Sequence, residues 1–362
     1  MTKKSSLLPI LLQQSRRRVI WSGWKLVIIL SMGLCVFALF RLHLSSPPET
    51  LLSRRRSFSR EVVFSGPPKI AFLFLVRRGL PLDFLWGSFF ENADTGNFSI
   101  YVHSEPGFEF DESTTRSRFF YGRQLKNSIQ VIWGESSMIE AERLLLDAAL
   151  EDPANQRFVL LSDSFLDVKE GRYHPKMSPV IPKDKWRKGS QWIALIRSHA
   201  EVIVDDVVIL PVFKKLCKRR PPLDASKGKL NIKLQKQHNC IPDEHYVQTL
   251  LSMSEREGEL ERRTVTYTVW NQSATKMENK GWHPKTFSYA NASPQKIKEI
   301  KGINHIDYET EYRTEWCRTN STFVPCFLFA RKFSRGAAMR LLSDGVAGPF
   351  DASSILARSA PD

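Results

Sequence analysis

Apolar and polar residues follow two different periods along the middle of the chain. The unbroken apolar run from Lys69 to Val76 predicts a strand that is buried on both faces of a sheet. Further strands are predicted at residues 98–103, 129–133 and 157–161. Apolar residues at helical spacing predict helices at 82–92 and 138–150, the second with a stripe of Ala141, Leu144, Leu145 and Ala148. Strands that alternate with helices are typical of an α/β domain.

The C-terminal half has a less regular pattern. Residues 191–197 and 264–270 predict strands, and residues 243–254 predict a helix. The Pro- and Lys-rich residues 220–237 predict a surface loop. In α/β sheets ligands bind beyond the carboxyl ends of the strands, which is where Arg77, His103 and Asp163 are expected.

A longer apolar segment precedes this domain. Residues 19–44 are apolar apart from Lys25 and Arg41 near the two ends, which predicts a transmembrane signal-anchor. No small-residue cleavage motif follows the segment, which argues against a removable signal peptide. We therefore predict a cytoplasmic tail at 1–18, a Ser-, Pro- and Arg-rich stem at 45–68, and a lumenal domain at 69–362.

Glycosylation sequons decide the orientation, because basic residues flank the apolar segment on both sides. Acceptor triplets begin at Asn97, Asn271 and Asn320, and a fourth at Asn291 is weakened by Pro294. Together with the anchor they predict a single-pass type II protein of the Golgi membrane, with its C-terminal domain in the lumen.

Composition narrows the classes of partner. The chain has 362 residues, of which 42% are hydrophobic, so it can bury a substantial core. Its formal net charge of +15 calls for an anionic partner. The predicted anchor and sequons argue against nucleic acid and favour nucleotide-sugar phosphates or anionic glycans.

Four of the five cysteines lie outside the predicted anchor, at positions 217, 240, 317 and 326. An even number of cysteines suits an oxidising compartment. Three pairings are possible, and we favour the local pairs Cys217–Cys240 and Cys317–Cys326. A zinc site is the competing interpretation, which the absence of any Cys-x-x-Cys unit disfavours.

Six short sequence blocks occur in one order along residues 69–342. They are Tyr101-Val102-His103, Leu161-Ser162-Asp163-Ser164, Lys188-Gly189-Ser190-Gln191-Trp192, Cys240-Ile241-Pro242-Asp243-Glu244-His245-Tyr246, Tyr267-Thr268-Val269-Trp270 and Phe329-Ala330-Arg331-Lys332-Phe333. In this order the blocks resemble the plant branch of the core-2/I-branching β-1,6-N-acetylglucosaminyltransferase family. The resemblance implies a GT-A-like fold, inversion at the anomeric carbon, a UDP-sugar donor, a glycan or glycoprotein acceptor, and no metal or other cofactor.

The donor sugar is expected to be N-acetylglucosamine, although related enzymes use UDP-xylose or UDP-glucuronate. An inverting transferase needs a carboxylate that takes the proton from the acceptor hydroxyl. Glu244 matches the family's base, and its alternative interpretation is a carboxylate favoured by the dipole at a helix start. Asp243 beside it is predicted to cap that helix.

The leaving UDP carries negative charge that the protein must neutralise. Asp163 supplies one carboxylate, too few for a metal site, and the pair Asp205-Asp206 reads as a cap or turn. The resemblance instead implies basic side chains against the diphosphate. Lys332 is the best match, with Arg313 or Arg318 as the second cation, and His103 and Asp163 complete the expected donor side.

The acceptor side is expected to combine aromatic and polar residues. Trp270 matches a family position that stacks on a sugar ring. Trp192, Glu170, Arg172 and Lys176 are further candidates, and each tryptophan has the alternative interpretation of a core residue.

One departure from the family pattern bears on activity. Relatives continue from Ser-Asp-Ser into a further segment that includes a helix, whereas here Ser164 runs directly into Phe165-Leu166-Asp167-Val168. About twenty residues are missing relative to that pattern, beside the expected nucleotide site. A second hypothesis is therefore a catalytically impaired Golgi membrane protein of the same fold that acts as a partner or scaffold.

Overall fold

The computed structural model describes residues 31–32, 64–162, 172–218, 240–261, 263–269, 284–308, 312–346 and 348. The chain divides into two compact units, Met1–Arg60 and Glu61–Asp362. The predicted tail, anchor and most of the stem lie outside the described residues. Within the described ranges, no helix is both long and apolar enough to cross a membrane.

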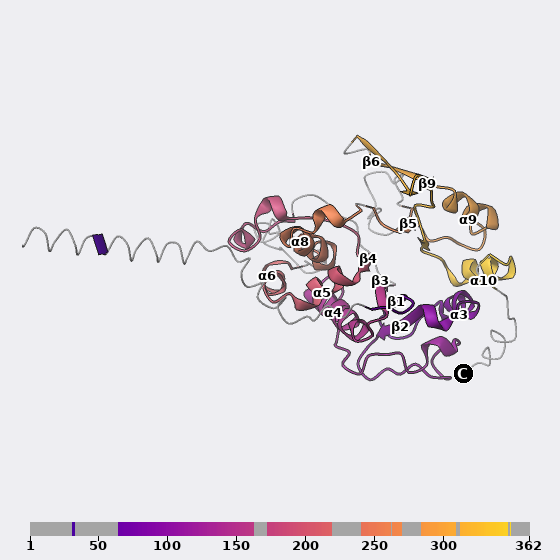
Figure 1. Cartoon of the computed structure of the whole chain (residues 1–362). Coiled ribbons are helices and arrows are strands. Elements are labelled where there is room, and N and C mark those ends of the chain that lie inside the picture. Colours follow the sequence, from indigo (N-terminus) through magenta and orange to yellow (C-terminus); the bar gives the residue numbers. More distant parts are fainter. Residues whose placement is uncertain are drawn as a thin grey trace, which may run out of the picture. The chain divides into compact units, whose positions relative to one another are not determined.

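A four-stranded sheet in the order β2–β1–β3–β4 lies at the centre of the second unit (Figure 1). The strands are β1 (Lys69–Leu75), β2 (Phe98–His103), β3 (Asn155–Ser162) and β4 (Ala194–Ile196). The first three are parallel to one another, and β4 runs antiparallel to β3. Three of the predicted strands are confirmed, while the strand predicted at 191–197 is shorter: β4 covers only Ala194–Ile196, and α5 begins at Arg197.

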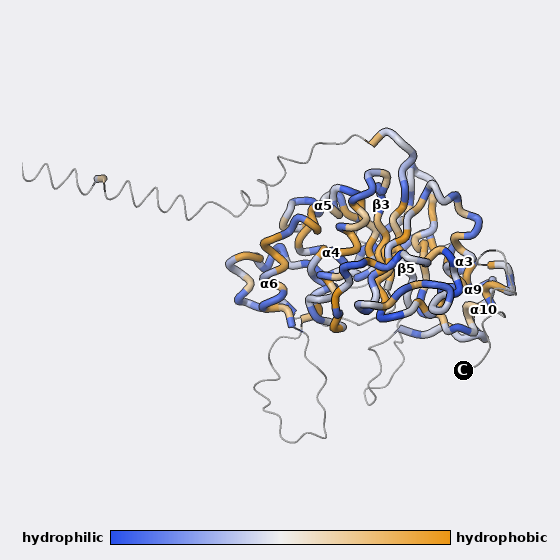
Figure 2. Tube along the Cα trace, turned by 90° about the horizontal axis from the view of Figure 1, so that it is seen from below, coloured by the Kyte–Doolittle hydropathy of each residue, from blue (hydrophilic) through white to orange (hydrophobic). Residues whose placement is uncertain are grey.

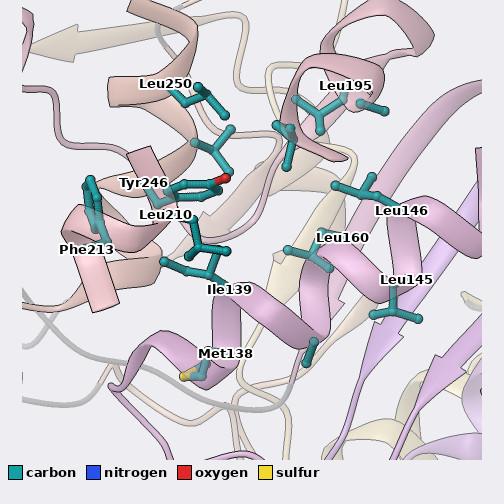
Figure 3. Packing of buried hydrophobic residues seen from close by; sticks show 14 of the residues in the cluster. Met138, Ile139, Leu145, Leu146, Leu160, Leu195, Leu210, Phe213, Tyr246 and Leu250 are labelled. Atoms are coloured by element: carbon teal, nitrogen blue, oxygen red, sulfur yellow. The ribbon is translucent and has the colours of Figure 1, made fainter. Parts of the chain in front are cut away.

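Strand β1 is buried on both faces, as its unbroken apolar run predicts. Ala71, Leu73 and Leu75 pack into one core cluster, and the alternate residues Phe72 and Phe74 pack into a second. The first cluster contains residues of α4 (Ser136–Leu150), α5 (Arg197–Asp205), α6 (Ile209–Leu216) and α8 (Tyr246–Met253) (Figure 3). In Figure 2 the hydrophobic colour is concentrated around β3 and α4.

The second face of the sheet is covered by aromatic side chains, several of them from α3 (Asp83–Glu91) and η3 (Arg118–Phe120). Phe74 meets both Trp86 and Phe120 edge-on, with ring centroids 5.1 and 5.3 Å apart. Edge-to-face pairs of this kind add stability beyond the area they bury. The predicted helix at 82–92 is therefore confirmed as α3, and its role is to close this face.

Helix α4 is confirmed, but its buried face differs from the predicted stripe. Ala141 and Leu145 are buried as expected, whereas Leu144 and Ala148 are only half-buried. The remaining buried positions include Met138, Ile139, Glu142, Leu146 and Ala149. The buried face therefore includes Glu142, a charged residue that the predicted apolar stripe did not contain.

Residues 129–133 do not form the predicted strand. The edge of β2 is occupied by residues 123–125 instead, since Val102 donates to the carbonyl of Arg123 and accepts from the N–H of Leu125, over 3.0 and 2.8 Å. Ile129 and Val131 pack on the first core cluster, while Ile132 is exposed. The apolar residues of this segment therefore contribute to the core without pairing along β2, whose edge residues 123–125 occupy.

The C-terminal part builds its own small core, from side chains that include Phe287, Ile300 and Leu341. Its elements are β5 (Thr266–Thr268), α9 (Pro294–Lys301), β6 (His305–Tyr308), β7 (Arg313–Trp316), β8 (Arg318–Thr319), β9 (Thr322–Phe323), β10 (Phe329–Arg331) and α10 (Arg335–Ser343). β5 pairs with β10 in parallel, while β6–β7 and β8–β9 are antiparallel pairs. The remaining short helices are η2 (Thr95–Asn97), η4 (Pro175–Met177), η5 (Lys183–Lys185), η6 (Pro242–Glu244) and η7 (Glu257–Glu259).

Two disulfides join the cysteines in the favoured local pairs. Cys217 bonds to Cys240 and Cys317 bonds to Cys326, with Cα atoms 4.9 and 5.3 Å apart. All four cysteines are buried. The zinc interpretation is therefore wrong, and the loop predicted at 220–237 lies outside the described residues.

Candidate active site

The predicted helix at 243–254 is interrupted in front of its main part. Pro242–Glu244 forms the 3-10 turn η6, and α8 starts only at Tyr246, with His245 at its N-cap. Glu244 therefore belongs to the turn and not to the first turn of α8, which weakens its interpretation as a helix-dipole carboxylate. Asp243 is likewise outside the N-cap position, so the prediction that it caps the helix is wrong.

Glu244 is buried and forms an ion pair with Arg172. The Nη1 atom of Arg172 donates to Oε2 of Glu244 over 2.9 Å, and the two side chains are only 8% and 4% exposed. A buried charge is tolerated where a partner and hydrogen bonds compensate for lost water. The structure thus joins two residues that sequence analysis assigned to different roles, the base and an acceptor contact.

The Gly-Ser-Gln-Trp block packs directly on the Pro-Asp-Glu-His block. The N–H of Gly189 donates to the carbonyl oxygen of Glu244 over 2.9 Å. Nearby, Nε2 of Gln248 donates to the carbonyl of Ser190 over 2.9 Å, and Nδ1 of His245 lies 2.8 Å from the carbonyl of Arg187. A Cβ at position 189 would lie 2.6–2.8 Å from the side chain of Gln248, which would have to move to admit it.

Trp192, at the end of the same block, links this region to the Ala-Arg-Lys-Phe block. Its side chain is buried, and the guanidinium carbon of Arg331 lies 4.7 Å from the ring centroid, within cation–π range. The buried position favours the core interpretation of Trp192. Lys332 follows Arg331 at the end of β10 and is half-buried, with its carbonyl accepting from the N–H of Phe287 over 2.7 Å.

A second carboxyl, Glu142 of α4, lies close to the turn η6. Burial, and after it the negative charge of Asp243, raise the pKa of Glu142 well above its usual range. Glu142 also lines a small cavity together with Arg143 and Tyr246. The Tyr246 hydroxyl donates to Oδ2 of Asp206 over 2.8 Å.

Asp206 caps α6, as expected for one residue of the Asp205-Asp206 pair. Its carboxylate accepts from the N–H groups of Val208, Ile209 and Leu210, each within 2.9 Å. A carboxylate used in this way stabilises the start of a helix. No group of three or more His, Cys, Asp or Glu side chains suited to a metal ion occurs among the described residues.

His103 ends β2 at the carboxyl edge of the sheet, where the donor is expected. The N–H of Ile129 donates to its Nε2 over 3.1 Å, so Nδ1 carries the proton of the neutral ring. Burial lowers the pKa of His103 to about 4, so the side chain is neutral at physiological pH. No described residue forms a hydrogen bond with the buried Nδ1.

The two arginines proposed as the second cation lie on different strands. Arg313 on β7 forms an ion pair with Glu315 over 2.6 Å and lies over the Tyr308 ring at 4.2 Å. Arg318 on β8 is exposed and lies over the rings of Trp316 and Phe323.

The other predicted site residues divide between surface positions and positions that the structure does not describe. Lys176 is exposed in η4, and the sequon residues Asn97 and Asn320 are exposed as well. Asp163, Glu170, Trp270 and Asn271 lie outside the described residues. Their assigned roles stay predictions.

Sequence reasoning missed Glu142 and Arg331. Glu142 had a detectable signal, because it sits between Ala141 and Leu145 on the apolar face of a predicted helix. Arg331 had no such signal, because its cation–π contact with Trp192 joins residues that are far apart in the chain.

The α/β domain has a parallel-rich sheet, which suits a GT-A-like transferase, and it also holds the buried carboxylate of Glu244. The family model for the Core-2/I-Branching enzyme matches residues 70–169 and 164–301. The chain therefore belongs to the Core-2/I-Branching enzyme family and is a glycosyltransferase. It is similar to glycosyltransferase BC10 of Oryza sativa subsp. japonica, with 50% identity over 305 residues that cover 76% of each chain.

The family model matches the chain in two stretches, and they meet where the sequence predicts a missing segment. Its two stretches overlap at residues 164–169, directly at the point where a segment is expected to be missing. A break in the family pattern at that point agrees with this expectation.

Proposed function

We propose that the protein transfers a sugar, N-acetylglucosamine as the first candidate, from its UDP-sugar to a glycan or glycoprotein, with inversion at the anomeric carbon. The observation that carries the proposal is the buried ion pair of Arg172 with Glu244. It lies where the Gly-Ser-Gln-Trp and Pro-Asp-Glu-His blocks are joined by hydrogen bonds. A carboxylate fixed on two sides in this way has the preorganisation that a general base needs.

Glu244 would act on the acceptor hydroxyl. As the hydroxyl oxygen attacks the anomeric carbon, its proton moves to the carboxylate, and the bond from that carbon to the UDP oxygen breaks on the opposite face. We assign this proton transfer to the Glu244 carboxylate, whose Oε2 accepts from Arg172. Arg172 then has a second role, because its charge holds the carboxylate in place while the proton arrives.

Cations would receive the charge that develops on UDP. We assign Lys332 to the diphosphate and Arg313 as its second cation, because fixed positive charges at a leaving group stabilise the transition state without reorganisation. The neutral His103 ring, with its buried Nδ1–H at the end of β2, is a candidate donor to the nucleotide. This arrangement requires no metal.

We also propose that the transferase domain lies in the Golgi lumen behind a signal-anchor at residues 19–44. Support comes from the two disulfides, which persist in oxidising compartments. The sequon residues Asn97 and Asn320 are exposed and therefore accessible to modification.

The central experiment measures UDP release by the full-length chain in detergent, with UDP-N-acetylglucosamine, UDP-xylose and UDP-glucuronate in turn. Glu244→Gln keeps the size of the side chain and removes the proton acceptor, so the transfer rate should fall about 10²- to 10⁴-fold. Glu151→Gln, an exposed position just after α4, is the matched control and should keep the parent rate. Equal rates for Glu244→Gln and the parent would refute the assignment of the base.

A non-catalytic partner protein of the same fold is the second candidate function. The observation in its favour is the divided family match at 164–169. If the folded parent binds UDP but transfers no sugar, inserting a family-like segment after Ser164 should restore transfer. Failure of that insertion in a folded protein would favour the partner role.

A further inference from the structure

Three exposed rings gather where the two C-terminal hairpins meet, and we call this surface the hairpin aromatic face. His305 and Trp316 have ring centroids 4.9 Å apart, and Trp316 and Phe323 have centroids 5.6 Å apart. Trp316 and Phe323 are each 49% exposed. A cluster of partly exposed aromatic rings indicates an interaction surface more often than a single exposed apolar residue does.

The hairpin aromatic face is held by backbone pairing and a disulfide. His305 is the register partner of Trp316 across β6 and β7, and Arg318 is that of Phe323 across β8 and β9. Cys317, between the two hairpins, bonds to Cys326. The N–H of Cys317 also donates to the carbonyl of Asn304 over 2.8 Å. The rings therefore keep their relative positions without a ligand, which lowers the entropic cost of binding one.

Arg318 adds a positive charge to this face. Its guanidinium carbon lies 4.6 Å from the Phe323 centroid and 5.6 Å from that of Trp316. Within the described residues Arg318 forms no ion pair, whereas Arg313 on the neighbouring strand forms one with Glu315. An arginine stacked on rings still presents its N–H edge, which suits bidentate binding of a carboxylate.

We propose that the hairpin aromatic face is a second glycan-binding site, separate from the transfer site, and that its ligand is an acidic glycan. The apolar faces of successive sugar rings would stack on Trp316 and Phe323, and a uronate carboxylate would pair with Arg318. Residues 69–362 have 42 Lys and Arg against 36 Asp and Glu, and this excess of positive charge favours the approach of such a polyanion. In Figure 1 β6 and β9 lie at the outer edge of the unit, away from β1 and β3.

An anionic membrane surface is the other macromolecule that attracts aromatic and basic residues. Its binding uses side chains that protrude far enough to enter the interface. Trp316 and Phe323 lie on paired strands and are 49% exposed, so the protein covers about half of each residue, whereas Tyr312, before β7, is 98% exposed. We therefore favour the glycan, and membrane binding becomes an outcome of the test.

The test measures binding of an oligogalacturonate to the full-length chain in detergent by calorimetry, with a neutral xylo-oligosaccharide of equal length as the comparison. Trp316→Ala should weaken oligogalacturonate binding about tenfold or more. Arg318→Gln should weaken it similarly and abolish the preference over the neutral chain. Tyr312→Ala is the matched control and should bind like the parent. Trp316→Leu, which keeps apolar bulk without the ring, replaces Trp316→Ala if that variant does not fold.

The result of this binding test does not depend on whether the proposed transfer site is correct. Glu244→Gln should bind the oligogalacturonate like the parent, even where transfer is lost. Absence of oligogalacturonate binding by the folded parent would overturn the proposal, as would binding that neither Trp316→Ala nor Arg318→Gln weakens. Binding to phosphatidylserine vesicles that Trp316→Ala removes, without any oligogalacturonate binding, would assign this face to the membrane instead.

Discussion

The backbone N–H of Gly189 donates to the carbonyl oxygen of Glu244, so the residue assigned as the base is fixed by its main chain as well as by its side chain. The two residues are far apart in sequence and belong to different family blocks. Their hydrogen bond joins the two blocks in space, so the block that contains Gly189 helps to position the turn that carries Glu244.

Gly189→Ala should disturb this contact. The backbone of Gly189 does not have a positive φ, so alanine fits locally, but its Cβ would lie 2.6–2.8 Å from the Gln248 side chain. We expect a loss of about 1–3 kcal/mol in the free energy of unfolding, together with a lower transfer rate. The double variant Gly189→Ala/Gln248→Ala should recover part of both, as measured by denaturant unfolding and UDP release. If Gly189→Ala has the stability and the transfer rate of the parent, the Cβ does not clash with Gln248 as predicted.

Arg172→Ala should leave Glu244 charged and buried without this partner. Removal of one member of a buried ion pair typically costs about 3–5 kcal/mol. Urea unfolding at pH 7 is the measurement, and adding Glu244→Gln to Arg172→Ala should regain much of the loss. A loss below about 1 kcal/mol would mean that water compensates the carboxylate and that the pair is not essential to the fold.

Glu142→Gln should change how stability depends on pH. The folded chain holds the pKa of Glu142 above its usual 4.5, so it binds that proton more tightly than the unfolded chain does. The resulting stabilisation is complete below pH 4.5 and is lost as the pH rises toward the raised pKa. Thermal unfolding from pH 4.5 to 8 should therefore show Glu142→Gln gaining stability relative to the parent. A constant difference across that range would show that Glu142 does not titrate as inferred.

Chelation tests the assignment of cations to the diphosphate. We expect the transfer rate of the full-length chain to survive excess EDTA, because Lys332 and Arg313 are assigned the role that a metal has elsewhere. Lys332→Ala should weaken UDP binding and lower the rate. Complete loss in EDTA that Mn²⁺ restores would refute this assignment.

Glycosidase treatment tests the lumenal orientation. Protein expressed in a eukaryotic secretory pathway should gain gel mobility after removal of N-linked glycans, and Asn97→Gln and Asn320→Gln should each reduce the shift. Both residues are exposed in this structure. A parent chain whose mobility does not change would place the domain on the cytoplasmic side.

Local patterns were sufficient to predict β1, β2, β3, α3 and α4, because each depends on apolar periodicity within one segment. Residues 129–133 show the same alternation, but strand formation also needs a partner, and residues 123–125 already occupy the edge of β2. The candidate site was likewise predictable only in part. The family blocks identified Glu244, whereas its ion pair with Arg172 joins residues 72 positions apart, which no local pattern reports.

The Cys217–Cys240 bridge has a practical consequence for handling the protein. It spans a sequence separation of 23 residues that includes numerous Lys and Arg trypsin sites. A chain cut once between the two cysteines remains one covalent molecule, with α6 and α8 still tied at their adjoining ends. On a gel without reductant such a nicked preparation would migrate as intact material, and only reduction would release its two fragments.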